Sequence, residues 1–390
     1  MEFTWTPEDE AFRSDLRAFI KENLPQDGDE TPRFGTDENY ENGRANAKKL
    51  ADKKWLTLAW PKEYGGMGAT HWQQAIFNWE ITYWRFPVIV GQGVSLAGPT
   101  IMIYGTDAQK AHWLPRIAAA DGMWCQLFTE PGAGSDLAAL QTRAVRDGDD
   151  YVISGQKLFT SFGHHADLGW AGFRTDPNAP KHRGISTFIV PMHSPGITIR
   201  PMINMAGVHE VNEIFFDEVR VPQDNLIGEE HRGWYQMMAT LDFERSGVQR
   251  YASATRTLEE LVAFAKEGQH NGHALAQEPQ VRNKLAQMHI ELEVGKYIGF
   301  RTISMQEHGQ VPNKEASASK VFGAELDQHM ANAGMNILNL YGQLQRGSKW
   351  AKLHGRIGYD YLDSVVGTIL AGSSEINRNI IANRGLGLPR

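Results

Sequence analysis

The chain has 390 residues, of which 41% are hydrophobic, and a formal net charge of -7. A chain of this length can bury two or three hydrophobic cores, so several domains are expected. Its acidic residues are dispersed, which gives no electrostatic reason to expect nucleic-acid binding. The single cysteine, Cys125, excludes an internal disulfide framework. No apolar run predicts a membrane-spanning helix, and the start MEFTWTPEDEAF lacks the pattern of a secretory signal. We therefore expect a soluble, cytoplasmic protein without membrane insertion.

The first third of the chain, residues 1–121, is expected to be an α-helical domain. Thr6 can cap a helix and Pro7 suits its first turn, and Leu16 and Phe19 follow at helical spacing. The loop WPKEYGGMGAT interrupts the helical pattern with a proline and three glycines.

Residues 122–231 change in texture, because segments such as DYVISGQKLFTS and NEIFFDEVRVP are rich in β-branched and aromatic residues. This part is expected to be a β-barrel or sandwich domain. Residues 232–390 return to helical spacing and are expected to form a helical bundle. Its expected helices run roughly over 232–266, 278–308, 314–343 and 362–384. The fold class predicted from the sequence is therefore α+β, in several domains.

Two motifs in the middle domain could bind a flat polar ligand. TEPGAGSD exposes backbone amides at its glycines, and the hydroxyls of Thr129 and Ser135 add donors. GQKLFTS puts Phe159 and Ser161 two positions apart on a strand, so an aromatic ring and a hydroxyl are expected on one face. The alternatives are an ordinary capped turn and plain strand packing.

The segment LDFERSG brings Asp242, Glu244 and Arg245 within one helical turn, where a solvated ion pair is the alternative to a functional site. The pair His164–His165 has no Cys or Glu at ligand spacing, so no metal site is expected. We find no Rossmann fingerprint, nucleophile elbow or Walker loop.

Four segments together closely resemble the acyl-CoA dehydrogenase family: TEPGAGSD, GQKLFTS, FFDEVRVPQDNLIGEEHRGW and GSSEINRNIIANRGLGLPR. The resemblance implies an N-terminal α domain, a middle β domain and a C-terminal four-helix bundle. It also implies FAD bound between the β domain and the bundle and across a subunit contact. The implied reaction is α,β-desaturation of an acyl-CoA thioester, with electrons passing to an electron-transfer flavoprotein. The implied assembly is a homotetramer or a heterotetramer with a homologous subunit.

The resemblance also implies the site residues. Thr129 matches a contact to the flavin ring, and Ser161 a hydroxyl near flavin N5. The complete set expected at FAD is Phe128, Thr129, Ser135, Phe159, Ser161, Gly342, Gln343, Ser373 and Glu375. The set expected at the acyl-CoA substrate is Ser135, Asp242, Arg245, Ala371 and Gly372.

Three departures from the family pattern bear on the chemistry. Ala371 stands where many relatives carry the carboxylate that removes the α proton. The Arg-x-x-Phe-Gly element that reaches a neighbouring subunit's FAD is absent, and a double glycine is reduced to Tyr341-Gly-Gln343. Some relatives, including isovaleryl- and long-chain-type enzymes, carry the base directly before an arginine of the first bundle helix. Glu244 precedes Arg245, so the resemblance implies Glu244 as the base.

Other interpretations stay open at this point. The chain could be one subunit of a heteromeric dehydrogenase, resembling the paired subunits of steroid side-chain degradation. It could be a degenerate subunit without catalysis, or a flavoprotein thioester lyase that needs no base. Small residues at Gly367, Ala371 and Gly372, expected along one helix edge, would leave room for a branched, cyclic or polycyclic acyl chain, or would allow close helix packing.

Overall fold

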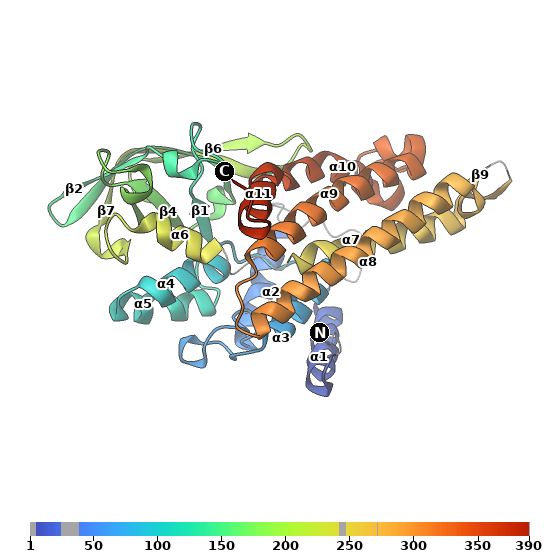
Figure 1. Cartoon of the computed structure of the whole chain (residues 1–390), viewed down its shortest axis with the longest axis horizontal. Helices are drawn as coiled ribbons and strands as arrows, with labels where there is room; N and C mark the ends of the chain where they lie inside the picture. The colour runs from blue at the N-terminus through green and yellow to red at the C-terminus, as the bar shows by residue number, and fades with distance from the viewer. Residues whose placement is uncertain (1–4, 25–38, 242–246, 271, 390) are drawn as a thin grey trace. The chain divides into compact units, whose positions relative to one another are not determined.

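The computed structural model describes residues 5–24, 39–241, 247–270 and 272–389. The described residues divide into two compact units, each built from separate stretches of the chain (Figure 1). Unit 1 falls within Met1–Thr31, Thr70–Phe86 and Arg245–Arg390, and unit 2 within Pro32–Ala69 and Pro87–Glu244.

Unit 2 contains an eight-stranded sheet in the order β6-β7-β3-β2-β4-β5-β8, with β1 paired in parallel to β4. The run LGWAGFR makes β4 buried at every position, as expected for a central strand covered on both faces. Its strands are β1 (Trp124–Leu127), β2 (Arg143–Asp147), β3 (Asp150–Ser161), β4 (Leu168–Arg174), β5 (Ile185–Pro191), β6 (Ile197–Ile203), β7 (His209–Pro222) and β8 (Leu226–Ile227).

Two hydrophobic cores lie on the sheet. Side chains from β1, β3, β4, β5 and β7 meet in one core, which includes Tyr151, Phe173 and Phe188. Side chains of the other face, such as Trp170, pack with helices in a second core that also holds Trp113. The helices of unit 2 are α2 (Tyr40–Asp52), α4 (Gly98–Tyr104), α5 (Asp107–Ala118) and α6 (Gly233–Leu241).

Unit 1 is a helical assembly in which α7, α8, α9 and α10 lie alongside one another (Figure 1). Its core is formed by leucine, isoleucine and methionine side chains of these helices. Its elements are α1 (Pro7–Asn23), α3 (His71–Tyr83), α7 (Val248–Glu267), β9 (Gln269–His270), β10 (His273–Ala274), α8 (Pro279–Glu307), α9 (Asn313–Leu338), α10 (Arg356–Gly367) and α11 (Ser374–Ile380).

A buried carboxylate joins α1 to α3 within unit 1. The Glu80 side chain is completely buried and accepts hydrogen bonds from Arg13 Nε at 2.7 Å and Arg17 Nε at 2.8 Å. Burial on its own would raise the pKa of Glu80, but the two guanidinium groups hold it below its usual value. The predicted start of the first helix is confirmed, because Thr6 and Asp9 form a reciprocal capping box.

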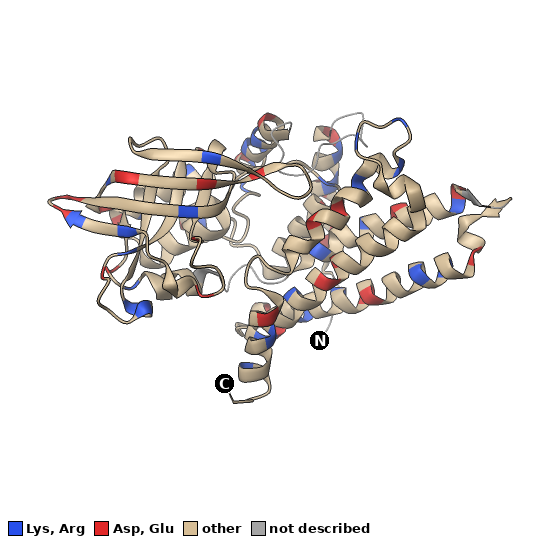
Figure 2. Cartoon of the chain, turned by 90° about the horizontal axis from the view of Figure 1, so that it is seen from above, with Lys and Arg blue, Asp and Glu red and all other residues tan. Residues whose placement is uncertain are grey.

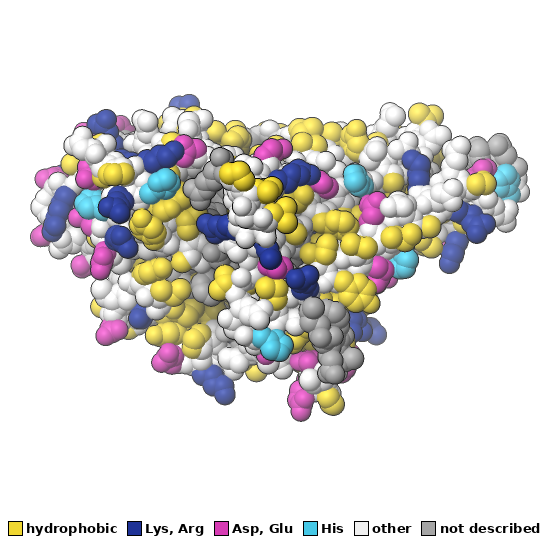
Figure 3. All heavy atoms as spheres, viewed as in Figure 1, with side chains coloured by type: hydrophobic (Ala, Val, Ile, Leu, Met, Phe, Trp, Pro, Cys, Tyr) yellow, Lys and Arg dark blue, Asp and Glu magenta, His cyan; other side chains and the backbone are white. Residues whose placement is uncertain are grey.

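The surface carries both signs of charge interspersed along the helices and strands (Figure 2). Hydrophobic side chains also gather on the bundle helices in the view of Figure 3. On α8, Ile290, Val294 and Tyr297 are spaced at helical intervals and are 57%, 46% and 55% exposed. Within the ranges that the structure describes, no helix is long and apolar enough to span a membrane.

The predicted fold class is confirmed: a helical N-terminal part, a middle β-sheet part and a helical C-terminal part. The boundaries between 121 and 122 and between 231 and 232 stay a prediction. Two predicted helices are wrong in extent. The one expected over 232–266 is two helices, α6 and α7, because Gly247 before α7 adopts a left-handed conformation with φ of 68°. The one expected over 362–384 is broken between α10 and α11.

Candidate active site

The loop after β1 carries the first group of predicted site residues. The ring of Phe128 is buried and packs against Trp170, with ring centroids 4.7 Å apart, so it belongs to the core. Thr129 is half-buried, and Ser135 is exposed directly after Gly134, where an added Cβ would be in open space. This loop can therefore present a hydroxyl and backbone groups to a ligand, while the Phe128 side chain anchors it.

The end of β3 carries the second group. Phe159 is 56% exposed and adopts a left-handed conformation with φ of 55°. The pairing of β3 with β7 shifts register between Lys157 and Thr160, which is a β-bulge. The regular alternation that predicts a shared face for Phe159 and Ser161 is therefore interrupted. Phe159 still offers an exposed aromatic ring, and Ser161 is half-buried.

Sequence reasoning did not single out an ion pair between these two groups. The ammonium of Lys157 is completely buried and lies 2.7 Å from a carboxylate oxygen of Glu130. Burial lowers the pKa of Lys157 to about 8, although Glu130 opposes this shift. Burial alone would raise the pKa of Glu130, but Lys157 and the hydrogen bonds to the carboxylate hold it below its usual value. The sequence signal available for this pair was a lysine inside a predicted strand together with a glutamate in the TEPGAGSD loop.

A turn in unit 1 carries Ala371, Gly372 and Ser373. Ala371 and Gly372 both have left-handed backbones, with φ of 51° and 81°, so the expected alignment of small residues along one helix edge is wrong. Asn377 Nδ2 donates to the carbonyls of Gly372 at 2.8 Å and Ser373 at 3.0 Å, which fixes the turn. The Ser373 hydroxyl caps α11 by accepting from the backbone N–H of Ile376.

The backbone N–H of Ala371 forms no hydrogen bond within the described part of the chain. It is therefore available to an oxygen of a ligand. The nearby Glu375 side chain is exposed, and a hydrogen bond from its own backbone N–H, together with one from Ser373, lowers its pKa. The side chain of Ala371 is exposed and contains no group that can accept a proton.

Of the remaining predicted site residues, the structure describes Gly342 and Gln343. Gly342 is buried, and a Cβ at this position would lie 3.0 Å from the sulfur of Met335, so the glycine allows close packing. Gln343 is exposed. Asp242, Glu244 and Arg245 lie outside the described residues.

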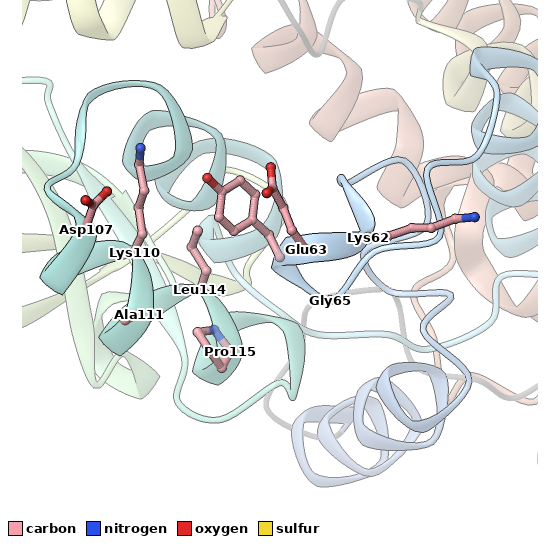
Figure 4. Close-up of a pocket in the computed structure, with 9 residues that line it drawn as sticks. Lys62, Glu63, Gly65, Asp107, Lys110, Ala111, Leu114 and Pro115 are labelled. Atoms are coloured by element: carbon pink, nitrogen blue, oxygen red, sulfur yellow. The ribbon is translucent and has the colours of Figure 1, made fainter.

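A separate pocket of about 530 Å³ lies in unit 2 between the short helix Lys62–Tyr64 and α5 (Figure 4). Its wall combines apolar side chains with two lysines and two acidic residues. The lining residues are Lys62, Glu63, Tyr64, Gly65, Asp107, Lys110, Ala111, Leu114 and Pro115. None of the predicted site residues lines it.

Comparisons with known proteins give the same three-part division of the chain. Family models described as Acyl-CoA dehydrogenase match in three parts: the N-terminal domain at residues 6–121, the middle domain at 125–219 and the C-terminal domain at 231–386. The chain is 37% identical to Acyl-CoA dehydrogenase FadE26 of Mycobacterium tuberculosis, covering 100% of this chain and 99% of that protein.

Two solved structures are similar along their whole length. The ChsE4-ChsE5 complex from Mycobacterium tuberculosis matches with 37% identity and a TM-score of 0.89, covering 100% of both chains. The Tcur3481-Tcur3483 steroid ACAD matches with 34% identity and a TM-score of 0.90, also covering 100% of both chains.

Proposed function

Because the chain belongs to the acyl-CoA dehydrogenase family, we propose that it binds FAD and desaturates an acyl-CoA thioester, with Glu244 removing the α proton. The observation that carries the choice of base is the side chain at Ala371, which cannot accept a proton. Glu244 is the acidic residue directly before Arg245, the arrangement that part of the family uses instead. An apolar acyl chain closing over this carboxylate would desolvate it and raise its basicity.

The residues present fit a flavin. Phe159 offers an exposed ring for a flat heterocycle, and the hydroxyls of Thr129 and Ser161 can donate to its polar edge. Ser135, Ser373 and Glu375 would hold the diphosphate and adenosine parts. When bound, FAD would accept the hydride that leaves the β carbon. The free N–H of Ala371 would donate to the thioester carbonyl, which makes the α proton more acidic without requiring a side chain at this position.

Glu244→Gln tests the base. Gln keeps the shape of the side chain and cannot take up the proton, so acyl-CoA should still bind while flavin reduction slows by at least about a hundredfold. Asp363→Asn is the control, because it removes an acid of α10 that is assigned to neither the FAD site nor the substrate site, and it should leave the reduction rate within a few-fold. Near-normal reduction in Glu244→Gln would refute the role of Glu244. Ala371→Glu added to Glu244→Gln asks whether a carboxylate at the usual family position restores activity.

The second proposal concerns assembly and substrate. Two similar structures are complexes of two named chains, and one is described as a steroid ACAD. We infer that this chain pairs with a homologous subunit and acts on a steroid side-chain acyl-CoA. The exposed apolar residues of α8 offer a surface that such a contact would bury. The reduced Tyr341-Gly-Gln343 element and the missing Arg-x-x-Phe-Gly element also favour a shared site.

Flavin content separates the assemblies. A chain that binds FAD only when produced together with a homologous subunit supports the heteromer, whereas a flavin-saturated homotetramer contradicts it. A thioester lyase would give a product other than the enoyl-CoA. A degenerate subunit would contribute no base, so Glu244→Gln in that subunit would leave the flavin reduction rate of the assembly unchanged.

We propose an electron-transfer flavoprotein as the electron acceptor, tested by comparing its reduction with that of an artificial acceptor. The cytoplasmic location stays a prediction.

A further inference from the structure

Lys157 makes three hydrogen bonds from a completely buried ammonium. Its Nζ donates to the carbonyl of Phe128 at 3.1 Å, to Glu130 Oε1 at 2.7 Å and to the carbonyl of Gly172 at 2.8 Å. Three donors thus meet three acceptors, which is the complete capacity of the ammonium group. A buried charge is tolerated when it is paired and fully hydrogen-bonded.

Glu130 uses the rest of its carboxylate to hold the backbone that follows the loop. Its two oxygens accept from the N–H groups of Gln141 at 2.6 Å and Thr142 at 3.0 Å. The backbone continues the same connection, since the N–H of Leu158 donates to the carbonyl of Thr129 at 2.8 Å. Residues 128–130 are therefore attached at three consecutive positions to residues 157–158 of β3.

Residues 157–158 lie directly before Phe159, whose backbone is strained. The left-handed region is strained for a residue other than glycine, and Phe159 holds this conformation within a β-bulge. On the far side of the bulge, the buried Asn212 donates from Nδ2 to the carbonyl of Thr160 at 3.1 Å. Strain of this kind persists where the surroundings impose it, and it is concentrated at functional sites.

We propose that Lys157 and Glu130 are positioning residues for the flavin, because their ion pair fixes the loop at Thr129 against the bulge at Phe159. Both side chains are buried, so the pair would act on the flavin through Thr129 and Phe159. It holds the hydroxyl of Thr129 and the exposed ring of Phe159 at a constant spacing, so that both are in place before a flat ring system binds. This inference rests on the proposed function, since it assigns the flavin to these two residues.

The test removes both charges at once. The double variant Glu130→Gln/Lys157→Met removes both charges of the pair together, and Met retains most of the length of the lysine stem. In the flavin-loaded assembly, we expect the Kd for FAD to rise by at least about tenfold and the visible absorption and circular dichroism bands of the bound flavin to shift. Glu80→Gln is the matched control, because it weakens a buried ion pair of unit 1. It should lower the melting temperature without moving the flavin bands.

A folded double variant with unchanged FAD affinity and unchanged flavin bands would overturn the inference. If the double variant does not fold, Glu130→Gln alone takes its place, since it keeps the side-chain shape and an acceptor for Lys157, and the same two measurements decide. Wild-type protein that contains no flavin in any assembly would instead refute the proposed function, and this inference with it.

Discussion

Replacing Lys157 alone should destabilise the protein more than replacing Lys157 and Glu130 together. In Lys157→Met, the Glu130 carboxylate stays 7% exposed and loses the ammonium that lies 2.7 Å from it. Removing one partner of a buried ion pair costs about 3–5 kcal/mol. In Glu130→Gln/Lys157→Met the charge is gone, and the loss that Lys157→Met alone does not share is an acceptor for one of the backbone N–H groups of Gln141 and Thr142. One unsatisfied buried donor costs about 1–3 kcal/mol. The double variant should therefore be more stable than the single variant by about 2 kcal/mol.

Urea unfolding of the four proteins in this cycle gives the coupling free energy. Trp170, which is completely buried beside Phe128, is one of 11 tryptophans, so intrinsic fluorescence follows unfolding of the chain as a whole. Hydrogen exchange of the peptides that contain Gln141 and Thr142 gives a local measure, since at least one of the two amides should lose protection in the variants that alter Glu130. Additive effects, with a coupling below about 0.5 kcal/mol, would refute the energetic argument.

Two further predictions concern stability. Ala371→Gly should raise the free energy of unfolding by about 0.5–1 kcal/mol. Removing the strain of an alanine in the left-handed conformation outweighs the extra flexibility of glycine in the unfolded chain. Urea unfolding measures this free energy, and a loss of stability would contradict the turn geometry. The second prediction is that the wild type should gain stability relative to Glu130→Gln/Lys157→Met as pH rises from about 8 toward the ordinary lysine pKa of about 10.4. In this range the unfolded chain binds a proton at Lys157 that the folded chain has lost. Glu130 stays ionised because its pKa is lowered, and the Arg174 guanidinium keeps its charge. Parallel pH profiles of the two proteins would contradict it.

Local signals were enough to predict much of the fold. The capping box at Thr6 depends on residues three positions apart, and the β4 segment is a continuous apolar run, so both could be read from neighbouring residues. The resemblance inferred from four motifs is confirmed by three family models that together span most of the chain. The individual site residues stay predictions.

The features that the sequence did not predict depend on contacts between residues far apart in the chain or on unusual backbone conformations. The partners of Lys157 lie 15, 27 and 29 positions away in the sequence, so no window of local sequence contains the ion pair and its acceptors. The bulge at Phe159 arises from pairing with β7, and it interrupts the two-residue alternation on which the prediction of a shared face depended. The break at Ala371 was missed because alanine and leucine favour a helix, whereas the hydrogen bonds from Asn377 stabilise a turn.

The turn at Ala371 explains how a chain of this family can lack the usual carboxylate and keep the rest of the site. Its shape depends on the Asn377 side chain, the cap at Ser373 and the backbone of Gly372, and none of these contacts uses the side chain at position 371. That side chain is exposed, so its replacement leaves the free backbone N–H in place. Under the proposed function, activation of the thioester carbonyl and removal of the α proton would therefore depend on different groups of the protein. The first would stay at Ala371 while the second moves to Glu244, and a carboxylate returned to position 371 would test whether the two positions serve one α carbon.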